Sequence, residues 1–142
     1  MTSQYDQVVD RLPPEVQRFA DGMCDVLGCS PRFWERRVAE YRGPGPGYRL
    51  FPAERFVVMC LREKLTARYH WSQVLVAKFF GISHGSLYHM TYKNCRVMFQ
   101  LYPDLRQAVL DADGYEAARF IFNHWEVAVR AACGHMELRA PS

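Results

Sequence analysis

The stretch SQVLVAKFFGISHGSLYHMTYK, residues 72–93, contains two helix-forming segments separated by a very short break. The first segment ends at Gly81, a residue type that commonly stops a helix in the left-handed conformation. Ser83 is a good N-cap for a second helix, which we expect to continue at least to Met98. Two helices joined through so tight a turn form a helix-turn-helix.

The second helix of this unit begins with small polar residues. Ser83, His84, Gly85 and Ser86 come first, and no large apolar residue appears before Leu87. A helix that only packs inside a bundle has little reason to begin this way. A helix whose first turn enters the DNA major groove needs small, hydrogen-bonding residues there.

The rest of the chain also has the pattern of helix, because runs of helix-forming residues alternate with Gly and Pro, and period-two alternation is almost absent. We expect six or seven helices. Residues 104–110, after Pro103, fit either a short helix or an irregular break. The other expected helices span residues 14–27, 31–41, 52–65, a fourth that is capped by Ser72 or His70 and ends at Phe80, 83–98, and 114–133.

The length and composition are those of one globular domain, with 142 residues of which 49% are hydrophobic and 23% charged. We therefore expect an all-α fold, a compact helical bundle in a single domain, residues 1–142. Its core is expected at residues 14–98, with a C-terminal extension at residues 103–135 that carries an extra amphipathic helix. No segment resembles a membrane span or a signal peptide, so we expect a cytoplasmic protein.

Positive charge is concentrated in the middle of the chain. Residues 32–96 carry a net charge of +8, whereas residues 1–31 carry −3 and residues 97–142 carry −2. Arg42 and Arg49 flank a GPGPG loop that cannot be helical. A basic centre between acidic ends suits a polyanionic partner, but solvated helix faces without a ligand give the same pattern.

Several kinds of chemistry are disfavoured. The sequence GISHG fits the G-x-S-x-G nucleophile elbow around Ser83, but the elbow needs a preceding strand and this one follows a helical segment. The five cysteines and five histidines lack zinc-ligand spacing, and no G-x-x-x-x-G-K-[ST] phosphate loop is present. We expect no enzyme activity, no metal, no cofactor and no nucleotide.

Residues 81–93, GISHGSLYHMTYK, resemble the signature of domain IV of the bacterial replication initiator DnaA, G-x-x-H-[ST]-[ST]-[VL]-x-H-x-x-x-K. Upstream, CLREKLT at residues 60–66 and VLGCSPRFW at residues 26–34 are similar to earlier helices of that domain. The resemblance extends over residues 16–95 in consistent order. The matching signature positions are Gly81, His84, Ser86, Leu87, His89 and Lys93.

The resemblance implies an all-helical, double-stranded DNA-binding bundle related to the tryptophan repressor fold. His84 and Ser86 would face base edges, while His89 and Lys93 would lie towards the DNA backbone. Arg55 or an arginine of the basic loop would enter the minor groove. The full set of expected DNA-binding residues is Arg42, Arg49, Arg55, Arg68, Ser83, His84, Gly85, Ser86, His89 and Lys93.

The chain departs from the family at two positions that normally help to read sequence. Ser83 stands where the family has Asp, and Gly85 where it has Ser or Thr. The initiator's own DNA box is therefore not expected as the target, and we expect the domain to act without an AAA+ ATPase.

We expect a bacterial or phage double-stranded DNA-binding protein, associated with the nucleoid, that acts in transcription or replication control by occupancy. The alternative is a protein-interaction module that keeps the initiator-like bundle without reading bases. Such a module would bind a replication protein or form a homodimer through the helix between Asp113 and Cys133.

Overall fold

The computed structural model describes residues 11–35, 50, 52–90 and 96–132. Within these ranges the chain is helical and has no strand, which confirms the all-α class. Residues 33–35 are also helical. The helices are α1 (Pro14–Leu27), α3 (Pro52–Arg68), α4 (Gln73–Phe80), α5 (His84–Met90), α6 (Arg96–Leu101), α7 (Pro103–Asp111) and α8 (Gly114–Ala132).

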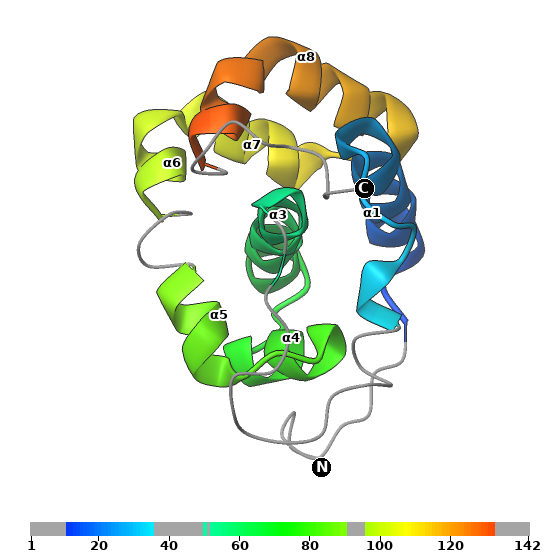
Figure 1. The fold of residues 1–142 in the computed structure, drawn as a ribbon, viewed down its shortest axis with the longest axis vertical. Coiled ribbons are helices and arrows are strands. Elements are labelled where there is room, and N and C mark those ends of the chain that lie inside the picture. Colours follow the sequence, from blue (N-terminus) through cyan, green and yellow to red (C-terminus); the bar gives the residue numbers. More distant parts are fainter. Residues whose placement is uncertain (1–10, 36–49, 51, 91–95, 133–142) are drawn as a thin grey trace.

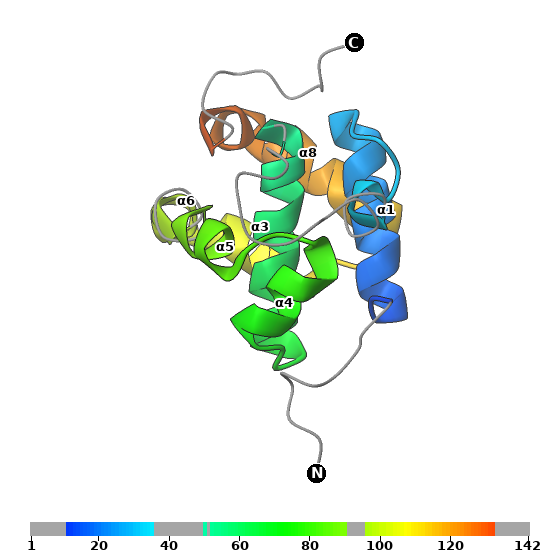
Figure 2. The ribbon, with the colours of Figure 1, turned by 60° about the horizontal axis from the view of Figure 1, so that its bottom comes forward.

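Helix α3 lies at the centre of the bundle. Figure 1 shows it surrounded by α1 on one side, α5 and α6 on the other, α4 below and α7 and α8 above. The turned view of Figure 2 keeps α1 and α5 on opposite sides of α3. Five consecutive residues of α3, from Val57 to Leu61, are almost fully buried. Five consecutive residues cover more than one full turn of a helix, so at this level α3 is enclosed on all sides.

Helices α1 and α8 form the most extensive helix pair of the described chain. Gly22 of α1 makes their close approach possible, because a Cβ atom added there would lie 2.7 Å from the Tyr115 Cα atom and 3.2 Å from the Ala118 Cβ atom. This packing closes the core on the side opposite α5 and leaves the α4–α5 unit on its own face of the bundle (Figure 1).

Several predicted helix bounds are confirmed. Helix α1 has the expected bounds, and Gly28 ends it with φ 77°. Helix α3 continues three residues beyond the expected Leu65, and the Thr66 hydroxyl donates to the Arg62 carbonyl oxygen at 2.9 Å within this added turn. The open interpretation after Pro103 is settled in favour of a helix, α7.

Other expected bounds are changed or lie outside the described residues. The single helix expected over residues 83–98 is divided between α5 and α6, with the undescribed residues 91–95 between them. Of the expected helix at 31–41, residues 36–41 lie outside the description, as does Cys133 at the end of α8. Helix α8 is also bent, because Trp125 has the non-helical angles φ −125° and ψ 28°.

Candidate nucleic-acid interface

The turn between α4 and α5 has the geometry expected from its sequence. Ser72 caps α4, since its hydroxyl oxygen accepts a hydrogen bond from the Leu75 amide at 3.1 Å. Gly81 ends α4 with φ 67°, and the Ile82 amide donates to the Ala77 carbonyl at 3.1 Å. This bond closes a left-handed glycine cap, which fixes the direction in which the chain leaves α4.

Helix α5 starts directly after this cap. The Ser83 carbonyl accepts a hydrogen bond from the Leu87 amide at 3.0 Å, which puts Ser83 at the predicted N-cap position. Leu87 is almost fully buried in the hydrophobic core, and α5 packs against α4. The first turn of α5 is therefore polar, and the buried Leu87 follows it in the same short helix.

The first turn of α5 is open to solvent. His84 and Gly85 are exposed, and a Cβ atom added at Gly85 would meet no other atom within 4 Å. A second molecule can therefore approach the α5 backbone at Gly85 closely. The description covers the backbone of Ser86 and His89 on the same helix, but not their side chains.

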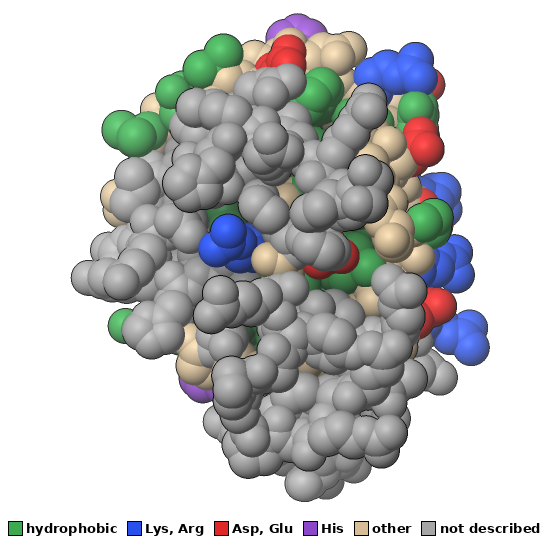
Figure 3. Space-filling view, viewed as in Figure 1, with side chains coloured by type: hydrophobic (Ala, Val, Ile, Leu, Met, Phe, Trp, Pro, Cys, Tyr) green, Lys and Arg blue, Asp and Glu red, His purple; other side chains and the backbone are tan. Residues whose placement is uncertain are grey.

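The α4–α5 unit lies within a long stretch of chain that lacks carboxylates. Residues 64–103, forty in all, contain no Asp or Glu and carry five Lys and Arg residues. In Figure 3 the visible acidic side chains lie mainly along the α1 and α8 edges. A segment without carboxylates of its own adds no like charge to repel phosphate groups.

The basic residues around the α4–α5 unit differ in their exposure. Arg55 on α3, an expected contact, is half-buried, whereas Lys78 in the last turn of α4, which was not among the expected contacts, is exposed. Arg68 is exposed, but its guanidinium is held by the Asp111 carboxylate at 2.9 Å. Arg42, Arg49 and Lys93 lie outside the described residues.

Two other basic residues of the central segment serve the bundle itself. Lys64 is only 4% exposed, and its Nζ atom donates to the carbonyl oxygens of Leu110, at 2.5 Å, and Val109, at 3.4 Å. It thereby satisfies the C-terminal end of α7. Burial, reinforced by the nearby charge of Arg68, lowers the pKa of Lys64.

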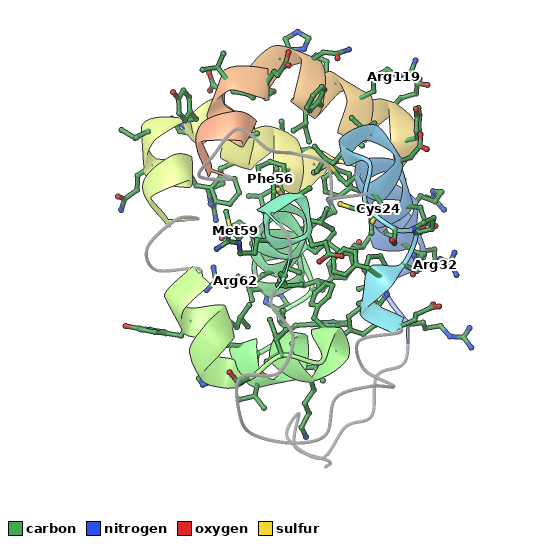
Figure 4. The ribbon with its side chains drawn as sticks, viewed as in Figure 1. Cys24, Arg32, Phe56, Met59, Arg62 and Arg119 are labelled. Atoms are coloured by element: carbon green, nitrogen blue, oxygen red, sulfur yellow. The ribbon has the colours of Figure 1, made fainter. Side chains whose placement is uncertain are left out.

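The second of these residues is Arg62, which belongs to an ion-pair network. Its Nη1 atom lies 3.0 Å from the Glu63 carboxylate, which also accepts from Arg106 Nε at 2.8 Å. The Arg62 side chain is only 18% exposed and lies between α3 and α5 in the view of Figure 4. The charge count of the central segment therefore includes side chains that are turned inward.

Sequence analysis missed one exposed feature of α8. Ala118 and Ile121 are buried and Phe122 and Trp125 half-buried, as their spacing predicts. Phe120, however, is 48% exposed and Val127 is 79% exposed. Their spacing does not identify them in the sequence, because the backbone at Trp125, between the two residues, is not helical.

The described residues show neither a metal cluster nor a membrane helix. No group of three or more His, Cys, Asp or Glu side chains within the described ranges is arranged to hold a metal ion. Among the same residues, no helix has both the length and the apolar character needed to cross a membrane. Helix α4 stands before Ser83 where a nucleophile elbow would need a strand.

Comparison of the chain with protein-family models, with curated proteins and with solved structures finds no match in any of the three. The candidate interface therefore stands on its own residues and geometry.

Proposed function

We propose that this protein binds double-stranded DNA and acts in transcription or replication control by occupying its site. In this proposal α4 and α5 form a DNA-binding helix-turn-helix, and the first turn of α5 enters the major groove. The observation that carries the proposal is the exposed polar start of α5 within forty residues that contain no carboxylate.

The shape of the α4–α5 unit supports this function. The glycine cap at Gly81 fixes the angle between the two helices, and Leu87 anchors α5, so the first turn is held rigidly while remaining exposed. His84 has ring nitrogens that can donate to or accept from a base edge, and Gly85 permits close backbone approach. A DNA-reading helix needs this combination of a fixed angle and a small polar tip.

The charge distribution supports the same face. Lys78 is exposed in the last turn of α4, beside the turn that leads into α5, where it can approach a phosphate backbone, whereas the Arg68 guanidinium is already bound to Asp111. Such contacts release condensed counterions and position the protein without reading sequence. Base contacts from His84 would supply the specificity. The resemblance to initiator domain IV assigns the same helix to the major groove.

A salt-dependent titration tests the proposal. We expect the full chain to retain a pool of random duplexes at about 50 mM salt, measured by fluorescence anisotropy. If it contacts about six phosphates, affinity should fall by ~10³ between about 50 and 200 mM salt. Lys78→Ala should weaken all duplexes alike and reduce the slope of log affinity against log salt by about one.

The control is Arg18→Ala, which removes the same charge from α1 on the other side of α3 (Figure 1). Arg18 is bound to Asp113 at 3.0 Å, and its loss should leave the salt slope unchanged. A chain that retains no duplex at about 50 mM salt contradicts the proposal and favours the protein-interaction module. Equal effects of the two variants would contradict the assigned face.

A further inference from the structure

One large side chain of α5 lies at the surface of the protein. Tyr88 is 51% exposed, whereas the preceding residue, Leu87, is 1% exposed and belongs to the hydrophobic core. Among the described residues of α5, Leu87 therefore supplies the contact with the core. The Tyr88 ring lies outside it.

Tyr88 lies on the same face of α5 as the residues proposed to meet DNA. It follows His84 by four residues and Gly85 by three, spacings that place residues on one face of a helix. His84 and Gly85 are exposed as well. Four residues of α-helix advance by about 6 Å, close to two base-pair steps of about 3.4 Å each. A helix lying in the groove would therefore bring Tyr88 to a different base pair from His84.

Gly85 leaves open space on this face of α5. A Cβ atom added at Gly85 would meet nothing within 4 Å, so the Tyr88 side chain does not fill this space. Side chains of a helix tilt towards its N-terminus, which directs the Tyr88 side chain towards the turn that contains Gly85. The exposed face of α5 thus combines an aromatic ring with bare backbone, and it has room for a small apolar group.

A thymine methyl group has the size and chemistry that this face accepts. Thymine is the only base of unmodified DNA that presents a methyl group in the major groove, and apolar side chains, aromatic rings included, recognise it by contact. The faces of a phenol ring carry no hydrogen-bonding atom, so they do not pair with the polar edges of the other bases. The absence of carboxylates from residues 64–103 favours a polyanionic partner on the same segment.

We propose that Tyr88 is a specificity-determining residue whose ring packs on the methyl group of a thymine, with the open space at Gly85 accommodating that methyl group. This inference rests on the proposed DNA binding and deepens it, because it names the base and the chemical group that α5 reads. The target site should accordingly contain a thymine at a fixed position, next to the base pair that His84 contacts or one step beyond it.

Removal of the methyl group alone tests the contact. Selection of the native chain on a random duplex pool at about 50 mM salt should enrich sites with a fixed thymine. Uracil at that position lacks only the methyl group and should weaken binding by about fourfold, the effect of one methyl-sized apolar group. In Tyr88→Ala the same replacement should change affinity by less than about twofold, measured by fluorescence anisotropy.

Three further variants separate the ring from other causes. Tyr88→Phe keeps the ring and should distinguish thymine from uracil as the native chain does. Gly85→Ala fills the open space with its own methyl group, so it should bind the uracil duplex at least as tightly as the thymine duplex. Tyr115→Ala removes another exposed tyrosine, at the start of α8, and should keep the native discrimination. The melting temperature of each variant verifies that it is folded.

The possible failures of the inference and of the proposed function are distinguishable. Selected sites without a fixed thymine, or equal effects of uracil on the native and Tyr88→Ala chains, overturn the inference and leave the proposed DNA binding intact. A Tyr88→Phe chain that no longer distinguishes the two bases does the same. A native chain that retains no duplex at about 50 mM salt overturns the inference together with the proposed function.

Discussion

The buried Lys64 ammonium shows how a basic residue can stabilise the bundle without binding a ligand. The last carbonyl groups of α7 have no partner within their own helix, and Lys64 of α3 supplies two donors to them. The charge also lies at the negative end of the α7 dipole. Burial disfavours the charged form of Lys64 and lowers its pKa. Keeping the charged ammonium in this buried position therefore reduces the stability of the fold.

Lys64→Met should lower the free energy of unfolding by about 1 to 2 kcal/mol at about pH 7, because the Leu110 carbonyl loses its Lys64 donor and the Val109 carbonyl keeps only the Ala112 amide. The deficit should grow as the pH rises towards about 10. In that range Lys64 binds more protons in the unfolded chain, where its pKa is about 10.4, than in the folded chain. This difference stabilises the native chain as the pH rises, and the Lys64→Met variant lacks it. Urea unfolding at several pH values measures this.

The control for this measurement is Lys78→Met, which alters an exposed lysine of α4 and should change stability by less than about 0.5 kcal/mol. A Lys64→Met deficit that stays constant or shrinks between about pH 7 and about pH 10 would contradict the assigned pKa direction.

The backbone conformation of residues with strong preferences could be predicted from the sequence. The partner of each charged side chain could not. Gly81 and Gly28 both adopt the left-handed conformation because few other residues do so without strain. The choice between Ser72 and His70 as the cap of α4 needed the structure, since both side chains can accept a hydrogen bond. Whether Lys64 faces solvent or α7 depends on residues some 45 positions away.

At the scale of elements, α1 and α8 are positioned by Gly22. Gly22→Ala would force the backbones of the two helices apart, because the added Cβ atom would lie 2.7 Å from the Tyr115 Cα atom. Overpacking of this kind costs about 1 to 3 kcal/mol, more than the helix propensity that alanine gains. Thermal or urea unfolding measures the loss.

Gly85→Ala is the matched control, since it makes the same change in α5 where nothing lies within 4 Å of the new atom. Its stability should rise by about 0.5 to 1 kcal/mol or stay unchanged. If the two glycine variants unfolded at the same urea concentration, the close α1–α8 contact would be wrong.

The sequence predicts helices well where the residues that begin and end them agree with the apolar periodicity, as in α1 and α4. It predicted one helix over residues 83–98, which contain no Pro or Gly beyond Gly85, whereas the structure describes α5 and α6 and leaves residues 91–95 outside the description. On α8 the burial of Ala118 and Ile121 was predicted, but the exposure of Phe120 and Val127 was not. An apolar residue on a helix looks like core until its exposure is known.

At the scale of the whole molecule, the bundle separates three surfaces. Helix α3 is enclosed in the centre, the α4–α5 unit presents an exposed polar turn, and α8 presents the exposed side chains of Phe120 and Val127 (Figures 1 and 2). The all-α class followed from the sequence. The arrangement of these surfaces did not, because it depends on contacts between distant helices such as α1 with α8.

The central claim is that the first turn of α5 contacts DNA. The most direct test places a photoreactive benzophenone amino acid at position 85, where the structure has open space, and irradiates the chain with duplex DNA at about 50 mM salt. The same group at position 123 of α8 serves as the control. We predict cross-links to DNA from position 85 and none from position 123. Cross-links from position 123 alone, or from neither position, would contradict the claim.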